Sequence, residues 1–404
     1  MIIYNFSQIP TLLTPRDLSI HFYATDESNK ISVSHSLYNY LTTSKKKIDN
    51  NVLEWDYYKK VINPYEFIHT PIHNSGRAVA EYSAISRSFY KLIEIVVQYN
   101  LFENFSDKPL QSFHLAEGPG GFIEAMMYMR KNYYDKYHGM TLLSDSRNVP
   151  KWNKLKNKFK FTNYIVYEYG ASGNGDLLNS ENFVECVKKY RNSMDFLTGD
   201  GGFDFSINYE KQELSSTKLV LAQIIYALIT QKLGGNFVLK IFDIFYGSTI
   251  EILYLLTAFY RDVSICKPKT SRFANSEKYI VCKDFIFSDT SPFFDSFYDI
   301  IQKLEGNTDL NIKSILRYNV PFYFIKEIEE LNCIFGKKQL NTIHSTLMMI
   351  QEQRNDKIDK LKKTNIDKCL QWCVKNNVPC NSYFKPHNIF KKDINKKNVI
   401  TLYE

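Results

Sequence analysis

Short apolar runs alternate with segments of helical periodicity between residues 78 and 290 of the chain. Runs bounded by glycine or polar residues predict strands, whereas apolar residues three and four positions apart predict helices. The predicted strands are Ser112–Ala116, Gly139–Leu143, Asn163–Tyr167, Met194–Thr198, Asn236–Phe242, Val263–Lys267 and Lys278–Cys282. The predicted helices are Ala78–Tyr99, one that begins at Phe122, Asn182–Arg191, Glu213–Lys232 and Thr249–Tyr260. This alternation is typical of a doubly wound α/β sheet.

The two flanks of this region have other patterns. Residues 1–75 mix polar Ser, Asn and Lys clusters with short apolar stretches, and they predict an N-terminal arm whose role the sequence does not reveal. Beyond residue 290 strand signals fade, helical periodicity dominates, and the chain ends in a Lys- and Asn-rich tail. We therefore expect three segments: an arm over 1–75, an α/β domain over 76–290 and a mainly helical module over 291–404.

Composition excludes several classes of protein. A hydrophobic share of 44% and a charged share of 23% are those of a folded chain rather than a disordered one. Seven cysteines in 404 residues are too few for a disulfide scaffold and favour a reducing compartment. The longest apolar stretch, Leu219–Ile229, is shorter than the roughly 18 residues that suggest a membrane span, and the N-terminus lacks the layout of a signal peptide. We expect an intracellular protein without a membrane segment.

Net charge adds little to this picture. The 51 Lys and Arg residues exceed the 43 Asp and Glu residues, which gives +8. An excess of this size, spread along the chain, is compatible with a polyanionic partner without proving one.

A glycine-rich turn, Glu117–Phe122, follows the predicted strand Ser112–Ala116. Glycines at such a turn let the backbone approach a ligand that a Cβ atom would keep away. The acidic Glu117 would repel a phosphate, so the turn suits a cationic or hydroxyl-rich ligand better than a dinucleotide. A plain strand-to-helix turn is the alternative interpretation.

Three ionisable residues stand at the ends of later strands or at their entrance. Asp200 follows the strand Met194–Thr198 between glycines, at the edge of the sheet where α/β folds bind ligands. Lys240 lies near the end of a buried strand, where a lysine is costly unless it is paired or neutral. Glu277 follows a polar Ser/Arg loop at the start of another strand. An Asp-Gly turn and a solvated lysine remain the alternatives for the first two.

These motifs, with Ser-Arg-x-x-x-Lys-Leu at Ser86–Leu92, resemble the FtsJ-like (RrmJ-type) family of RNA ribose 2′-O-methyltransferases. The resemblance implies an α/β Rossmann-like methyltransferase fold with a seven-stranded mixed sheet. It also implies a Lys-Asp-Lys-Glu catalytic tetrad, which here falls on Lys91, Asp200, Lys240 and Glu277. Lys240 would be the general base in its neutral form, with the two carboxylates orienting the lysines.

The cofactor implied by the resemblance is S-adenosyl-L-methionine, and the chemistry requires no metal. Its contacts would come from the glycine-rich turn and from acidic residues after the strands: Glu117, Gly118, Pro119, Gly120, Gly121, Phe122, Asp145, Asp176 and Asp200. For Asp145 a solvated loop position is an equal alternative.

The Glu-Gly-Pro-Gly-Gly-Phe motif resembles most closely the mRNA cap-methylating branch of eukaryotes and large DNA viruses. That branch implies capped mRNA as substrate, methylation of a cap-proximal nucleotide, and capping or transcription machinery as partners. The protein would then lie in the cytoplasm or nucleus, or in the host cytoplasm or virion if viral. A ribosomal or transfer RNA methyltransferase and an inactive RNA-binding scaffold are the alternatives.

RNA must reach such a site across basic surface. The candidate contacts are basic residues near the motifs: Arg87, Arg147, Lys151, Lys154 and Arg272. A solvated helix face is the alternative for the lysine run that begins at Lys151. The oligomeric state is left open.

Overall fold

The computed structural model describes residues 1–7, 13–24, 29–72, 75–106, 108–146, 149–160, 162–202 and 212–387. The chain forms two compact units, of which the first combines Met1–Lys59 with Ala84–Glu352 and the second combines Lys60–Ser83 with Gln353–Glu404. The first unit thus draws on all three segments expected from the sequence. The division into arm, α/β domain and helical module stays a prediction about separate roles.

A mixed eight-stranded sheet is the centre of the first unit, with the strand order β1-β8-β9-β7-β6-β3-β4-β5. Its strands are β1 (Ile2–Asn5), β3 (Gln111–Leu115), β4 (Lys136–Met140), β5 (Ile165–Glu168), β6 (Met194–Gly199), β7 (Gln231–Ile241), β8 (Tyr260–Lys267) and β9 (Lys278–Phe285). Strands β3 to β7 run parallel to one another, whereas β9 pairs antiparallel with both β7 and β8. This topology confirms the Rossmann-like α/β fold class.

The expected count of seven strands is wrong by one. The additional strand is β1, which pairs antiparallel with β8 at the sheet edge and lies within the predicted arm. Ile2 and Tyr4 pack against the core on one face of the strand, while Ile3 is exposed. Four residues of alternation are too short a pattern to separate an edge strand from a loop.

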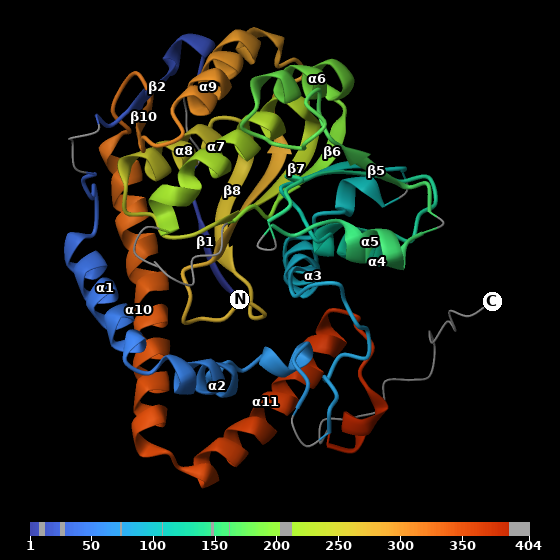
Figure 1. The fold of residues 1–404 in the computed structure, drawn as a ribbon, viewed down its shortest axis with the longest axis vertical. Helices are drawn as coiled ribbons and strands as arrows, with labels where there is room; N and C mark the ends of the chain where they lie inside the picture. Colours follow the sequence, from blue (N-terminus) through green and yellow to red (C-terminus); the bar gives the residue numbers. More distant parts are fainter. Residues whose placement is uncertain are drawn as a thin grey trace. The chain divides into compact units, whose positions relative to one another are not determined.

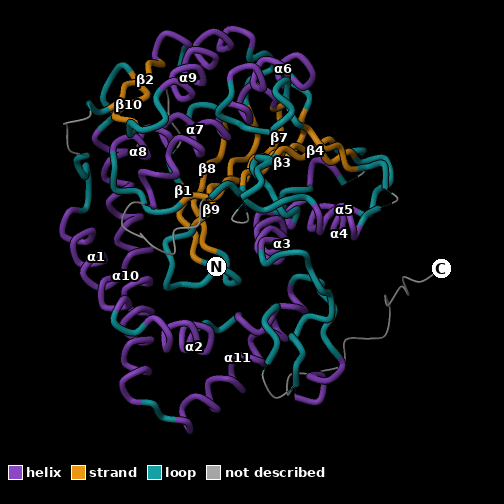
Figure 2. Tube along the Cα trace, in the orientation of Figure 1, coloured by secondary structure: helices purple, strands orange, loops and turns teal. Residues whose placement is uncertain are grey.

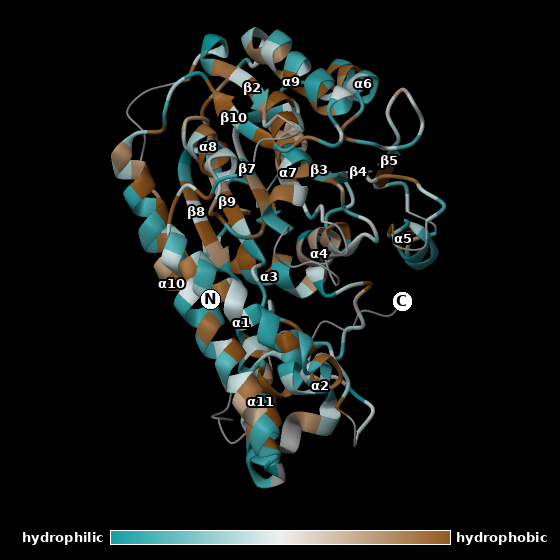
Figure 3. Cartoon of the chain, turned by 60° about the vertical axis from the view of Figure 1, so that its left-hand side comes forward, coloured by the Kyte–Doolittle hydropathy of each residue, from teal (hydrophilic) through white to brown (hydrophobic). Residues whose placement is uncertain are grey.

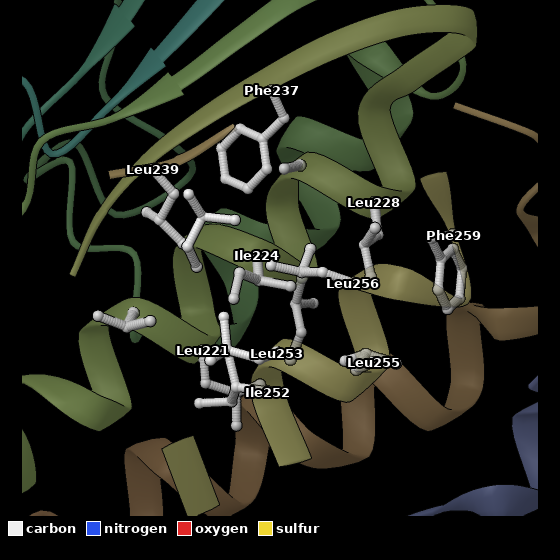
Figure 4. Close-up of a cluster of buried hydrophobic side chains, with 14 of the residues drawn as sticks. Leu221, Ile224, Leu228, Phe237, Leu239, Ile252, Leu253, Leu255, Leu256 and Phe259 are labelled. Atoms are coloured by element: carbon white, nitrogen blue, oxygen red, sulfur yellow. The ribbon is translucent and has the colours of Figure 1, made fainter. Parts of the chain in front are cut away.

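Helices cover both faces of the sheet (Figures 1 and 2). One face carries α3 (Ser88–Tyr99), α4 (Gly121–Arg130) and α5 (Asn153–Lys158). The other carries α6 (Ser180–Tyr190), α7 (Gln212–Thr230), α8 (Gly247–Thr257) and α9 (Phe294–Gly306). Leu221 and Ile224 of α7 meet Leu253 of α8 and Leu239 of β7 in the buried core (Figure 4), all fully shielded from solvent. Removing such large apolar surfaces from water is the main stabilising contribution to the unit.

The remaining elements lie outside this layered arrangement. A second sheet consists of β2 (Leu18–Phe22) and β10 (Ile312–Leu316). The further helices are α1 (His35–Asp49), α2 (Val52–Ile62), α10 (Phe322–Glu352) and α11 (Asn355–Lys375). Short 3₁₀ turns lie at Pro15–Asp17, Glu66–Ile68, Glu103–Phe105, Ser291–Phe293 and Ser382–His387. The sequence did not predict the second sheet, whose ladder has register shifts and joins segments far apart in the chain. Among the described helices, none combines the length and apolar character needed to cross a membrane.

Several predicted boundaries are wrong, and two of them show the physical reason. The helix expected over Ala78–Tyr99 begins only at Ser88, because the N–H groups of Val79 and Ala80 donate to the carbonyls of Phe67 and Ile68 instead of to a helix. The strand expected over Gly139–Leu143 is β4, which ends at Met140, beyond which the N–H of Leu143 donates to the carbonyl of Asn174. In both cases pairing with a distant segment overrides the local pattern.

Candidate active site

The sheet register brings the strand-end residues of β6, β7 and β9 together. Gly199 of β6 pairs with Leu239 of β7, so the next residues along these parallel strands, Asp200 and Lys240, lie side by side. Lys240 pairs in turn with Tyr279 of β9. The carboxyl ends of parallel strands meet at one edge of a sheet, which is where open α/β folds bind ligands.

The four residues of the expected tetrad form two ion pairs at this edge. Nζ of Lys91, on α3, lies 2.7 Å from Oε1 of Glu277, and Nζ of Lys240 lies 3.0 Å from Oδ1 of Asp200. Lys240 also donates a hydrogen bond of 2.6 Å to the backbone carbonyl of Asp200. The four side chains are between 12% and 17% exposed, so each charge is largely shielded from water and depends on its partner.

The Lys91–Glu277 pair is electrostatically unequal. Burial lowers the pKa of the Lys91 ammonium, and the carboxylates of Glu277 and Asp200 oppose that effect. Burial acts to raise the pKa of Glu277, but the charges of Lys91 and Lys240 outweigh it and hold that pKa well below its usual range. Glu277 is therefore a permanent carboxylate at neutral pH.

The glycine-rich turn joins β3 to α4 at the same edge. Gly120 has φ of +109°, a backbone conformation that favours glycine. Oε1 of the buried Glu117 accepts a hydrogen bond from the N–H of Phe122, while Oε2 is buried without a hydrogen-bond partner among the described residues. Burial raises the pKa of Glu117 well above its usual value, against the opposing effect of the Phe122 N–H. The unsatisfied oxygen is suited to a donor or a cation brought by a ligand.

A buried threonine links this turn to the loop that carries Asp176. Oγ1 of Thr141 accepts a hydrogen bond of 3.2 Å from the N–H of Gly118. On its other side, Gly175 approaches Thr141 so closely that a Cβ atom would lie 2.1 Å from the Thr141 carbonyl oxygen. Asp176 follows at once, and its Oδ1 accepts a bond of 2.9 Å from the N–H of Leu178. The structure thus places Asp176 next to the segment that meets the glycine-rich turn.

Asp145 is placed differently from the other predicted cofactor residues. Its side chain is fully exposed, and its Oδ1 lies 3.8 Å from Nζ of Lys151. A contact between Asp145 and a cofactor stays a prediction.

The basic residues predicted to meet RNA fall into two groups. The charge of Arg87, which precedes α3, acts on Lys91, and Arg272 lies on the loop that leads to Glu277, so both are close to the tetrad. Lys151 and Lys154 are exposed and lie just before and on the hydrophilic helix α5 (Figure 3). Arg147 lies outside the described residues.

Three polar residues of the site were not singled out from the sequence. Besides Thr141, they are Ser271, whose Oγ donates a 2.8 Å bond to Oε1 of Glu277, and Lys267 at the end of β8. The sequence could have pointed to such residues as polar positions directly after an apolar strand. It does not show which residue each of these side chains contacts. Among the described residues, no group of three or more His, Cys, Asp and Glu side chains could hold a metal ion.

The segment that contains the site matches a known protein family. The family model described as FtsJ-like methyltransferase matches residues 84–285, which is half of the chain. The chain belongs to the FtsJ-like methyltransferase family. The matched range contains the two ion pairs and the glycine-rich turn of this FtsJ-like domain, and it confirms the family expected from the motifs.

Relatives of this FtsJ-like chain have names that refer to the mRNA cap. It is 30% identical over 288 residues to the cap-specific mRNA (nucleoside-2′-O-)-methyltransferase 1A of Caenorhabditis briggsae, covering 67% of this chain and 32% of that protein. It is 31% identical over 333 residues to the cap-specific mRNA (nucleoside-2′-O-)-methyltransferase 1 of Dictyostelium discoideum, covering 78% and 42%.

A third relative carries a different description. The chain is 29% identical over 288 residues to the inactive cap-specific mRNA (nucleoside-2′-O-)-methyltransferase 1B of Caenorhabditis briggsae, covering 67% of this chain and 33% of that protein. The chain spans about a third of the length of both Caenorhabditis relatives.

Proposed function

We propose that this protein transfers a methyl group from S-adenosyl-L-methionine to a ribose 2′-hydroxyl of RNA, at a cap-proximal nucleotide of mRNA. The observation that carries the proposal is the pair of shielded ion pairs, Lys91–Glu277 and Lys240–Asp200, beside a glycine-rich turn at the carboxyl edge of the sheet. The names of the relatives support RNA caps as the substrate.

The residues of the glycine-rich turn fit the cofactor. When bound, S-adenosylmethionine supplies an electrophilic methyl group on a sulfonium. Oε2 of Glu117, buried without a partner among the described residues, is an acceptor for a cationic amino group. Gly118, Gly120 and Gly121 leave the backbone of the turn accessible beside it, with Pro119 and Phe122 completing the segment. Asp176, with Asp145 and Asp200, would supply further carboxylates.

Lys240 is the residue we assign as general base. The 2′-hydroxyl is a weak nucleophile, so it must be oriented and must lose its proton as the methyl group arrives. Loss of a proton to solvent converts the ammonium of Lys240, paired with Asp200, to the neutral amine that accepts the hydroxyl proton, and the ammonium formed again is stabilised by Asp200, whose Oδ1 lies 3.0 Å from Nζ. The proton then leaves to solvent, which reaches the 13% of the Lys240 side chain that is exposed.

Lys91 has a different task in this proposal. Its ammonium is held by both oxygens of Glu277, at 2.7 Å and 2.8 Å. A fixed positive charge near the reacting hydroxyl favours the developing oxyanion and orients it toward Lys240. Glu277 thus keeps Lys91 in place without contacting the base directly.

Basic surface near the site would hold the RNA. Arg87 and Arg272 lie close to the tetrad. Lys151 and Lys154 are exposed, on the segment whose Pro150 and Leu155 lie against the glycine-rich turn. Positive side chains that contact the phosphate backbone position a nucleic acid without reading its sequence. Discrimination for the cap must come from other contacts.

The test is methyl transfer from tritiated S-adenosylmethionine onto short RNAs that differ only in the cap. Transfer to the capped RNA, with the label on a cap-proximal ribose, is the expected result. Preferred transfer to the uncapped RNA would instead support the other substrate class, a ribosomal or transfer RNA. Since one relative is described as inactive, cofactor binding is measured by calorimetry in parallel. Absence of both binding and transfer would identify a scaffold.

A further inference from the structure

A buried lysine outside the tetrad fastens the loop that carries Glu277. Lys267 is the last residue of β8 and is 4% exposed. Its Nζ donates three hydrogen bonds, of 2.8 Å to the carbonyl of Asn275, 2.8 Å to Oδ1 of Asn275 and 2.6 Å to the carbonyl of Glu277. These acceptors use all three N–H groups of an ammonium.

The same loop, residues 268–277, is anchored a second time by helix α3. Glu94 accepts hydrogen bonds from the N–H groups of Lys269, at 2.8 Å, and Thr270, at 3.1 Å. Glu94 and Lys91 lie on neighbouring turns of α3, so the helix that carries one member of the ion pair also holds the loop that carries the other. Glu94 fixes the beginning of the loop, and Lys267 fixes its end.

If stability were its only role, a buried ammonium at position 267 would be a costly choice. Burial lowers the pKa of Lys267 well below its usual value, with the carboxylate of Glu277 opposing this effect. An apolar side chain of similar length would fill the space without desolvating an ammonium. The ammonium provides three hydrogen bonds to the Glu277 end of the loop, and an apolar side chain would provide none of them.

We propose that Lys267 is a positioning residue for the methyl-transfer site: it fixes the backbone of Glu277 so that the carboxylate holds Lys91. This inference rests on the proposed function, since it assigns Lys267 to that same reaction. Lys267 touches neither substrate nor cofactor in this account. It acts only through Glu277.

The first experiment is a double-mutant cycle in kcat between Lys267→Met and Glu277→Ala. Lys267→Met lowers kcat by about 10²-fold, as expected for a displaced catalytic group, and leaves the affinity for S-adenosylmethionine unchanged. In the Glu277→Ala background the same substitution has no further effect, because its target is gone. An equal loss in both backgrounds, or no loss in the wild-type background, overturns the proposal.

Lys218→Met is the matched control. Lys218 also fastens a loop by donating to backbone carbonyls, those of Asn307 at 2.7 Å and Thr308 at 2.5 Å, but that loop carries no residue of the tetrad. Its replacement leaves kcat unchanged. If Lys267→Met does not fold, Asn275→Ala removes one of the three acceptors and lowers kcat by a smaller factor, and an unchanged kcat there counts against the proposal.

The second measurement does not depend on activity. Hydrogen exchange of the amides in residues 270–277 is faster in Lys267→Met than in the wild type, whereas exchange in residues 307–309 is unchanged. Unchanged exchange in 270–277 overturns the positioning role even when the wild type is active. Conversely, a wild type that transfers no methyl group refutes the proposed function, while the exchange result still decides whether Lys267 fastens the Glu277 loop.

Discussion

Nζ of Lys91 lies 2.7 Å from Oε1 of Glu277, although 186 positions separate the two residues in the chain. This contact joins helix α3 to the start of β9, and it is distinct from the second pair, in which Lys240 meets Asp200. The four charged side chains therefore form two contact pairs, although the charges of Asp200 and Lys240 also act on Lys91 and Glu277. Separate pairs imply that removing one carboxylate impairs one lysine more than the other.

Glu277→Gln tests this division. The substitution keeps the size of the side chain but leaves the largely buried Lys91 without its charge partner, so we expect a destabilisation of about 3 kcal/mol. Because the folded-state pKa of Glu277 lies below its unfolded value, its stabilising contribution is present above about pH 4.3 and is lost as the pH falls toward the folded pKa. Urea unfolding at several pH values should show a smaller loss on acidification in the variant.

Asp299→Asn is the control for that measurement. Asp299 pairs with Lys303 at 2.8 Å on α9, but both side chains are about half exposed, so we expect a change below about 1 kcal/mol. Equal destabilisation by the two substitutions would contradict the importance of shielding at the Lys91–Glu277 pair.

Glu117→Gln tests the cofactor assignment. The amide keeps an acceptor for the N–H of Phe122, but it no longer offers a carboxylate to a cationic amino group. Loss of one charged hydrogen bond predicts an affinity for S-adenosylmethionine lower by about 10- to 100-fold, measured by calorimetry. An unchanged affinity would mean that Oε2 of Glu117 does not contact the cofactor.

Two glycines of one loop make a matched pair of substitutions. Gly173 and Gly175 both have positive φ, +74° and +69°, but a Cβ atom at Gly173 meets nothing within 4 Å, whereas at Gly175 it would lie 2.1 Å from the carbonyl of Thr141. Gly173→Ala should therefore cost only the backbone strain, about 1 to 2 kcal/mol. Gly175→Ala should cost more and should also weaken cofactor binding, because Thr141 bonds to Gly118. Equal effects of both variants on unfolding and on cofactor affinity would contradict a link from Gly175 through Thr141 to the glycine-rich turn.

Two buried histidines predict how stability depends on pH. Burial lowers the pKa of His114 to about 3 and that of His138 to about 4. Between these values and the unfolded value of about 6.5 the unfolded chain binds more protons, so acidification destabilises the fold by about 1.4 kcal/mol per pH unit for each histidine. His114→Gln should remove one such contribution between about pH 6 and 4.5. A variant with the wild-type slope would show that His114 is protonated in the fold.

The sequence locates the strand ends that carry the candidate site residues better than it locates the elements around them. Asp200, Lys240 and Glu277 each lie at a strand end or its entrance, and strand ends can be read from apolar runs followed by glycine or polar residues. The edge strand β1 and the pair β2–β10 are short, and they exist because distant segments pair with them. Likewise, the partners of Thr141 and Lys267 are set by tertiary structure, so local sequence could not reveal them.

In the proposed reaction Lys240 accepts the proton of the ribose hydroxyl, and a single comparison of variants tests this role most directly. Methyl transfer to capped RNA is measured for the wild type, Lys240→Ala and Lys240→Arg, with cofactor binding as the check on folding. We predict transfer by the wild type only, because alanine offers no base and arginine stays protonated, with cofactor binding retained in both variants. Substantial transfer by either variant would contradict the account.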